Sequence, residues 1–366
     1  MSANPYQTHT HPMTLRSQTP SNVLFIVDPQ NDFSDVGPGR RAAGSLAVTG
    51  STADYARIIN FLKQTDIQEV HVSLDTHSKR HIAHPGFWEV WTGQQWVNAT
   101  DENSKLRELF IDANGNICGR NMMIDNPNTD IRLYRPRNYR TQVHGKKDQL
   151  HEDLCTYVRD YINFFYQENN MHLQKPMIWP NHCIEKSPGH RVASELSEFL
   201  QRWVNVDTGP ATKPRILRYH NKGRNNLVEM YSAFSADKPV TQSDTQHFGI
   251  AAYDSAGYPT FEHNSTGHAQ YTDCSTNVNN ELNEPLIQHL LRNHNRVYFC
   301  GEARTHCVKA TLLDVMKVVL ANRTLYNPAN VTLLHNMSSP ILPVDNDKHP
   351  DDIARIMQQN GFSVRY

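Results

Sequence analysis

The sequence predicts a three-layer α/β fold, in which a doubly wound parallel sheet carries helices on both faces and long loops are inserted. Short apolar, β-branched segments alternate along the chain with segments whose apolar residues recur at helical spacing. Such alternation is typical of parallel sheets. Polar residues that could carry chemistry follow several of the apolar segments. In folds of this class, ligands bind beyond the carboxyl ends of the strands.

Six short segments rich in apolar and β-branched residues predict buried strands. They span residues 22–27, 69–74, 175–179, 215–219, 296–301 and 331–335. Five segments with apolar residues at helical spacing predict helices. They span residues 52–63, 149–167, 189–203, 281–293 and 306–321.

A polar stretch over residues 1–21 precedes the first predicted strand and has no apolar segment. It indicates a disordered tail and no signal peptide. Residues 22–366 are predicted to form a single domain. Two long polar segments, about 86–147 and about 235–280, are interpreted as irregular insertions in that domain. Such loops serve as lids or oligomer contacts, so a homo-oligomer is one expectation, and surface decoration is the alternative.

Composition narrows the class of partner. The formal net charge of −1 argues against nucleic acid or an anionic membrane as the main partner. No apolar run approaches the roughly 20 residues that span a bilayer. The six cysteines form no CxxC pair, so free thiols in a reducing compartment, and therefore a cytoplasmic protein, are expected. The expected partner is a small molecule.

A cysteine, an aspartate and a lysine each follow a predicted strand. Cys307 precedes a helix, whose dipole should lower the thiol pKa and whose N–H groups could stabilise an oxyanion. Asp28 could exchange a proton with this thiol, and Lys222 could pair with Asp28. Taken singly, these residues suit a buried structural cysteine, a turn aspartate and a solvated lysine. Together they predict a nucleophilic catalytic set.

A second set of residues suits a metal ion. Asp75 and His77 alternate at the end of the second predicted strand, and His182 follows the third. One aspartate and two histidines, with water completing the shell, suit Zn²⁺ first and Fe²⁺ or Mn²⁺ as alternatives. His81 is a further candidate ligand, whereas His84 is interpreted as structural. Because the chain has 20 histidines, a hydrogen-bonded polar pocket is the simpler alternative.

Two aromatic residues lie next to these candidate groups in the sequence. Phe33 ends the segment that begins with Asp28, and Trp179 begins the segment that contains His182. They could sandwich a flat ring, although packing in the core is the usual role of such residues.

At these motifs the chain resembles the nicotinamidase branch of the isochorismatase-like cysteine hydrolases, in a larger subgroup with insertions. The resemblance covers the framework from about residue 22 to 340. It rests on Asp28-Pro-Gln-Asn-Asp-Phe33, Asp75-Thr-His77, Trp179-Pro-Asn-His182-Cys183, Ser187-Pro-Gly189, Lys222-Gly223, Tyr231-Ser-Ala-Phe234 and Gly301-Glu-Ala-Arg-Thr-His-Cys307-Val308.

The resemblance implies an isochorismatase-like fold in which Asp28, Lys222 and Cys307 are the catalytic triad. It also implies an oxyanion hole formed by the N–H groups of Ala303 and Cys307, and a cis peptide bond between Glu302 and Ala303. The chain departs from the family pattern of a small apolar residue followed by Ala-Thr-Asp. Here the four corresponding residues, 302–305, are Glu-Ala-Arg-Thr.

The resemblance further implies that Asp75, His77 and His182 hold one divalent metal ion that positions a pyridine nitrogen. Phe33 and Trp179 would then flank the substrate ring. The implied activity is metal-dependent C–N hydrolysis, which converts nicotinamide to nicotinic acid and ammonia through a thioester acyl-enzyme in NAD metabolism.

Two alternatives stay open. The first is hydrolysis of another small amide or carbamoyl compound on the same fold, although relatives of that kind generally lack a third ligand at the position of His182. The second is a catalytically silent scaffold that binds partners through its insertions. The departures before Cys307 and the long insertions bear on the substrate rather than on the chemistry.

Overall fold

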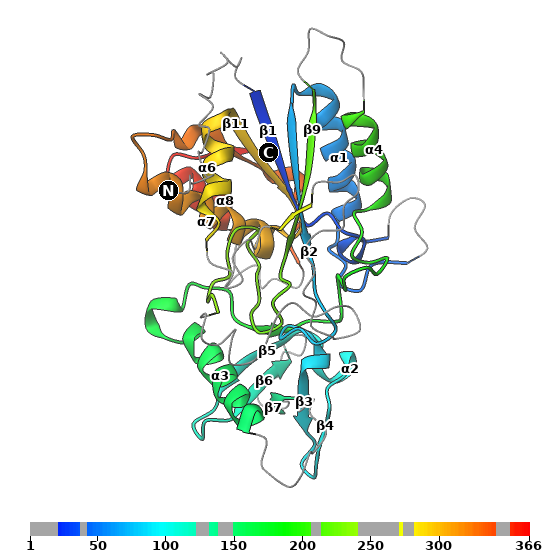
Figure 1. The fold of residues 1–366 in the computed structure, drawn as a ribbon, viewed down its shortest axis with the longest axis vertical. Coiled ribbons are helices and arrows are strands. Elements are labelled where there is room, and N and C mark those ends of the chain that lie inside the picture. The colour runs from blue at the N-terminus through cyan, green and yellow to red at the C-terminus, as the bar shows by residue number, and fades with distance from the viewer. Residues whose placement is uncertain are drawn as a thin grey trace, which may run out of the picture.

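A seven-stranded sheet, in which each paired strand is parallel to its neighbour, forms one half of the computed structural model (Figure 1). The structure describes residues 21–36, 42–121, 132–137, 149–205, 214–240, 271–273, 282–341 and 352–366. The order of the strands across the sheet is β10-β9-β2-β1-β11-β12-β13. In chain order they are β1 (Ser21–Val27), β2 (Glu69–Asp75), β9 (Ile216–Lys222), β10 (Tyr271–Asp273), β11 (His294–Gly301), β12 (Val331–Leu334) and β13 (Ser363–Arg365).

Helices cover both faces of this sheet, because successive side chains of a strand point to opposite faces. Val23, Phe25 and Val27 of β1 belong to the core beneath one group of helices, and Leu24 and Ile26 belong to the core beneath the other. The first group is α6 (Glu284–Asn293), α7 (Lys309–Ala321) and α8 (Asp352–Gln359), and the second is α1 (Ser51–Gln64) and α4 (Ser194–Val204). The predicted doubly wound, three-layer α/β fold is confirmed.

A second, antiparallel sheet lies beyond the carboxyl ends of the parallel strands (Figure 1). Its strands, in the spatial order β4-β3-β7-β6-β5-β8, are β3 (Trp88–Trp91), β4 (Trp96–Asn98), β5 (Arg107–Ile111), β6 (Ile117–Asn121), β7 (Arg132–Pro136) and β8 (Met177–Ile178). Helix α3 (Gln149–Phe165) packs on it through a separate apolar cluster, and α2 (Asp101–Ser104) is a single turn between β4 and β5. The prediction that residues 86–147 are irregular is therefore wrong for those residues of the segment that the structure describes. The strands were missed because they are short and carry many polar residues.

The strand predicted over residues 175–179 is also wrong in its placement. Only Met177 and Ile178 are extended, and they pair antiparallel with β5 rather than joining the parallel sheet. Pro176 and Pro180 flank this pair, and proline cannot donate a hydrogen bond to a neighbouring strand, which confines such a segment to short pairings. The residues that follow Trp179 therefore reach the site from the antiparallel sheet.

Two helices begin later in the chain than predicted. Helix α6 begins at Glu284, because the Asn283 side chain accepts a hydrogen bond from Leu286 N and Pro285 occupies the first turn. Helix α4 begins at Ser194 rather than at 189.

The predicted tail over 1–21 lies outside the described residues except for Ser21, and so does most of the segment 235–280.

Two further expectations concern cysteines and membranes. Five of the six cysteines, namely Cys118, Cys155, Cys183, Cys300 and Cys307, are free thiols, and Cys274 lies outside the described residues. Among the helices that the structure describes, none is both long and apolar enough to cross a bilayer.

Candidate active site

Asp28 lies directly after β1, at the carboxyl end of the sheet. Its side chain is fully buried, and Ser73 holds it: the Ser73 hydroxyl donates to Asp28 Oδ1 at 2.6 Å and accepts from Asp28 N at 3.1 Å. The backbone of Asp28 has a φ of 46°, in the left-handed region. A non-glycine residue there costs about 1–3 kcal/mol and persists only where its surroundings fix it. The turn thus aims the carboxylate across the strand ends.

Lys222 is the last residue of β9 and lies opposite Asp75 in the sheet register. Its ammonium group is 3.0 Å from Asp28 Oδ2 and 3.1 Å from Asp75 Oδ1, and it donates to the Met230 carbonyl at 2.8 Å. Burial alone would lower the pKa of Lys222, but the two carboxylates outweigh burial and hold that pKa well above its usual value. Lys222 is therefore a permanent cation that links two buried acids.

Cys307 lies in a π-helical turn, Arg304–Val308, between β11 and α7. Its sulfur is 3.6 Å from Lys222 Nζ. Burial raises the pKa of the thiol well above its ordinary value, Lys222 opposes this, and Asp28 and Asp75 add to it. The predicted lowering of this pKa is wrong, because the partial charge of a helix terminus is small beside complete burial next to two carboxylates. The thiol therefore has to hand its proton to a base before it can attack.

Asp28 is placed to be that base. Burial raises the pKa of its carboxyl group, while Lys222 opposes the shift. Asp28 also lies close enough to Cys307 to raise the pKa of its thiol. A carboxyl group with a raised pKa is better matched to a thiol proton than an ordinary aspartate. The structure thus brings the three residues of the predicted catalytic set together at one point.

Asp75 joins this set to a cluster of histidines. Its Oδ1 faces Lys222, while its Oδ2 is 3.0 Å from His77 Nε2 and 3.3 Å from His182 Nε2. The loop that carries His182 is held against the end of β2, because His77 N donates to the Cys183 carbonyl at 3.0 Å. Gln30 fixes the other side of Asp75, accepting from Asp75 N at 2.7 Å and donating to its carbonyl at 2.8 Å.

The hydrogen bonds of both histidines decide where their lone pairs point. His77 Nδ1 lies 3.0 Å from the Gly223 carbonyl, and His182 Nδ1 lies 2.8 Å from the Pro180 carbonyl. Because a carbonyl only accepts, each Nδ1 carries the proton and each neutral ring leaves a lone pair on Nε2. Both lone pairs then face Asp75 Oδ2, so three electron-pair donors converge with no hydrogen between them. This donor set fits a divalent metal ion.

Charge at this point favours a cation. Burial would lower the pKa of His77, but Asp75 raises it above its usual value. Burial would raise the pKa of Asp75, but His77 and Lys222 hold it well below its usual value. A positive charge between Nε2 and Oδ2 is therefore stabilised, whether a proton or a metal ion carries it.

His81, the additional ligand candidate, has partners on both ring nitrogens: Nε2 is 3.0 Å from the Val228 carbonyl, and Nδ1 accepts from Ala83 N at 3.2 Å. It nevertheless lies near enough to His77 and Glu229 to share an ion. His84 donates from Nδ1 to the Ser78 carbonyl and faces His182 Nδ1 with Nε2 at 3.2 Å, so it orients His182.

Glu229 is a buried acid that sequence reasoning missed. Its side chain lies beside His77 and His81, and burial raises its pKa while His77 opposes the shift. The signal was a lone acid in the apolar stretch Leu-Val-Glu-Met-Tyr at 227–231. An acid in such a stretch is seldom buried without a partner.

A small chamber opens onto the sulfur of Cys307, with about 20 Å³ of space open to water. Phe33 and Trp179, the predicted ring-binding residues, both line it, together with Ala303 and His182. The peptide bond between Glu302 and Ala303 is cis, as the resemblance implied. The predicted catalytic, metal and aromatic residues thus surround one point at the carboxyl edge of the sheet.

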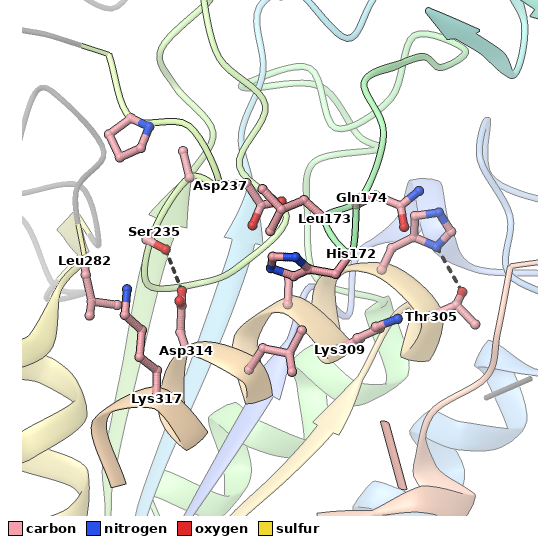
Figure 2. Close-up of a pocket in the computed structure, with 15 residues that line it drawn as sticks. His172, Leu173, Gln174, Ser235, Asp237, Leu282, Thr305, Lys309, Asp314 and Lys317 are labelled. Carbon is pink, nitrogen blue, oxygen red and sulfur yellow. Dashed lines mark hydrogen bonds between the residues drawn. The ribbon is translucent and has the colours of Figure 1, made fainter. Parts of the chain in front are cut away.

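A larger cavity of about 510 Å³ adjoins this chamber, and His306 lines both spaces. Figure 2 shows Asp314 and Lys317 on α7 facing Ser235 and Asp237 across it. The Ser235 hydroxyl donates to Asp314 Oδ2 at 2.6 Å, the dashed contact in Figure 2. The outer cavity is therefore far larger than the chamber at the nucleophile, and its walls are both polar and apolar.

Asp237 gives the outer cavity a measurable pH dependence. Burial raises the pKa of Asp237 to about 7, and Asp314 and Glu229 add to the shift. In the unfolded chain this group ionises near pH ~4, so folding becomes less favourable as pH rises from about 4 to 7 and stays so above. Asp237→Asn should therefore stabilise the protein at pH 8, by at most about 4 kcal/mol, and leave it unchanged at pH 4.

Thermal unfolding of both proteins at the two pH values checks this expectation. Asp160→Asn, at an exposed position on α3, is the matched control and should shift neither melting temperature. Equal effects of Asp237→Asn at pH 4 and pH 8 would contradict the assigned pKa.

Solved structures similar to this chain include nicotinamidases and pyrazinamidases. Yeast nicotinamidase bound to the inhibitor nicotinaldehyde is 16% identical, over 94% of this chain and 99% of its own, with a TM-score of 0.46. The nicotinamidase/pyrazinamidase of Acinetobacter baumanii is 15% identical over 95% and 97%, with a TM-score of 0.43. Pyrococcus horikoshii pyrazinamidase in complex with zinc is 14% identical over 95% and 100%, with a TM-score of 0.37. No protein-family model and no curated protein sequence matches the chain.

Proposed function

We propose that this protein is a metal-dependent cysteine amidohydrolase that converts nicotinamide to nicotinic acid and ammonia. The observation that carries the proposal is the position of Lys222, 3.0 Å from Asp28 and 3.6 Å from the Cys307 sulfur. A buried nucleophile, a base and a cation at this spacing have the elements of covalent catalysis. Asp75 ties them to a metal-ligand set, which supports a substrate that also carries a metal-binding nitrogen.

The residues account for each step of the reaction. Asp28 takes the thiol proton as the Cys307 sulfur attacks the amide carbon, and the N–H groups of Ala303 and Cys307 stabilise the developing oxyanion. Asp28 then gives the proton to the leaving nitrogen, and ammonia departs to leave a thioester. Water deprotonated by Asp28 attacks the thioester, so that the acid is released and the thiol restored. Lys222 stays charged and offsets the negative charge on Asp28 and sulfur.

Asp75, His77 and His182 would hold the metal ion, with Zn²⁺ favoured by their nitrogen and oxygen donors and Fe²⁺ or Mn²⁺ as alternatives. When bound, the ion supplies a Lewis-acid site for a ring nitrogen. Phe33 and Trp179 line the chamber and would flank the ring. The aromatic side chains that line the chamber support a flat acyl group.

Removal of one metal ligand gives a direct prediction. His182→Ala should lower the Zn²⁺ affinity of the protein by about 100-fold or more, because one of three protein ligands is lost. Metal-free protein titrated with Zn²⁺ against a competing chelator measures this affinity. His172→Ala, which changes a histidine of the outer cavity, is the matched control and should bind Zn²⁺ as the wild type does. Equal Zn²⁺ affinity in both variants would show that His182 is not a ligand of the metal ion.

A second candidate function is hydrolysis of a larger small-molecule amide. The cavity of about 510 Å³ beside His306 supports this reading, because it offers room for a substituent that the inner chamber cannot hold. In this case Cys307 and Asp28 keep their roles, and the outer cavity selects the substrate.

Ammonia or amine release from a panel of amides distinguishes the candidates. The panel contains nicotinamide, pyrazinamide, benzamide and a nicotinamide with a hydroxyalkyl group on the amide nitrogen. We expect nicotinamide to be hydrolysed well and benzamide poorly, because benzamide lacks a ring nitrogen for the metal. Preference for the substituted amide would favour the second candidate. No release from any amide by folded, metal-loaded protein would refute both.

A further inference from the structure

A second cluster of histidines surrounds Glu69 at the opposite edge of the parallel sheet. Glu69 is the first residue of β2, whereas Asp75 is the last, which separates the two clusters by about 20 Å at the usual rise of a strand. Glu69 Oε1 is 2.9 Å from His71 Nε2 and 3.8 Å from His289 Nε2, and Glu69 Oε2 is 3.1 Å from His294 Nε2. Three rings thus present Nε2 to one buried carboxylate.

The partners of the other ring nitrogens orient the lone pairs of two of these rings, whereas His289 Nδ1 faces Asn293 Nδ2 at 2.8 Å. His294 Nδ1 lies 3.1 Å from the Leu290 carbonyl, so it carries a proton and leaves Nε2 of the neutral ring facing Glu69. His71 Nδ1 is 2.7 Å from His220 Nε2, a partner that can hold the ring with Nε2 unprotonated. Metal-binding histidines are characteristically fixed through their second nitrogen in this way.

The spacing of the donors also suits an ion. A tetrahedral shell with bonds of about 2.1 Å places its ligand atoms roughly 3.4 Å apart. The separations of 2.9, 3.1 and 3.8 Å around Glu69 bracket that value, and the separations around Asp75, 3.0 and 3.3 Å, are similar. The donor atoms of Glu69, His71 and His289 all lie within 4.8 Å of one another.

We propose that Glu69, His71 and His289 form a second binding site for a divalent ion of the Zn²⁺ class, with His294 beside the other carboxylate oxygen of Glu69. This proposal does not depend on the metal site proposed at Asp75, because the two sites share no residue. The His289 side chain is 41% exposed, which gives an ion a way in from solvent.

Arg218 lowers the affinity expected of this site for a cation. Its Nε donates to Glu69 Oε1 at 2.8 Å, so a guanidinium cation lies beside the carboxylate that would bind the ion. Like charges at this distance repel. We therefore expect Arg218 to weaken the binding of an ion at Glu69.

Metal stoichiometry of the full chain tests the proposal. Metal-free protein is titrated with Zn²⁺ alone, and the bound metal is measured by elemental analysis after gel filtration. We expect two ions per wild-type chain, one in His289→Ala, one in His182→Ala, and none in the double variant. Gln288→Ala, the neighbouring position on α6, is the matched control and should keep two. Because His289 is half-exposed, its replacement should leave the circular dichroism spectrum unchanged.

Two outcomes would overturn the second site: a single ion in the wild type that His182→Ala removes, or two ions retained in His289→Ala. A single ion that His289→Ala removes and His182→Ala retains would instead support the second site and defeat the catalytic one. As an independent arm, Arg218→Gln introduced into His182→Ala should tighten the one remaining Zn²⁺ binding step by about tenfold or more. Unchanged or weaker binding at that step would count against the ion lying beside Glu69.

Discussion

Cys307→Ala should abolish amide hydrolysis while the protein remains folded. The side chain is buried in a turn between β11 and α7 and is 3.6 Å from Lys222 Nζ, so alanine removes the nucleophile and little else. We expect the rate to fall by about 10,000-fold or more, the scale seen when an enzyme loses its nucleophile. Steady-state release of ammonia, with thermal unfolding as the check on folding, measures the effect.

Cys155→Ala is the matched control for this variant. Cys155 is a partly buried free thiol on α3, away from the candidate site, and its replacement should leave the rate unchanged. Hydrolysis by Cys307→Ala within tenfold of the wild-type rate would exclude the thioester and point to direct attack by water.

Asp28→Asn should lower the rate by roughly 100- to 10,000-fold, the range that general acid–base catalysis supplies. Asparagine keeps the shape of the side chain and can still accept the hydrogen bond from Ser73, but it cannot take the thiol proton. The wild-type rate should fall as pH drops through the raised pKa of Asp28, because the protonated acid is no base. This acidic limb should be missing in the variant.

Asp32→Asn is the control within the same motif. Asp32 Oδ2 accepts from Cys183 N at 2.7 Å, so it ties two loops together and has a structural role. Its replacement should lower the melting temperature and leave the acidic limb of the rate in place. A normal rate with an unchanged acidic limb in Asp28→Asn would show that another group moves the proton.

Much of the fold could be predicted from the sequence, because buried residues recur at a fixed spacing in helices and strands. The strands β1, β2, β9 and β11 lie inside the parallel sheet, and β1 and the second half of β11 appear in the sequence as apolar runs. The residues at the ends of the four strands converge because parallel strands end at one edge. The positions of these strands in the sequence are therefore enough to predict that four candidate residues lie close together, namely Asp28, Asp75, Lys222 and Cys307. The antiparallel sheet was missed, because strands such as β3 bury only alternate residues, Trp88 and Val90.

The electrostatics of the site could not be predicted in the same way. The pKa of Cys307 depends on how completely the fold buries it and on the distances to Asp28 and Asp75, which no local pattern encodes. Glu229 was missed for a related reason, since its partners lie far away in the sequence, on the loop after β2. Long-range contacts therefore decide the parts of the site that sequence spacing leaves open.

A ring aldehyde tests the central claim most directly, because an aldehyde can accept the sulfur of Cys307 but has no nitrogen to release. Pyridine-3-carbaldehyde labelled with ¹³C at the carbonyl is added to metal-loaded protein, and the carbon resonance is recorded. We expect the trigonal aldehyde signal to be replaced by that of a tetrahedral carbon, and Cys307→Ala not to show this change. We also expect weaker binding after the metal is removed. A carbonyl that stays trigonal at saturating aldehyde in the folded, metal-loaded wild type would contradict the assignment of Cys307 as the nucleophile.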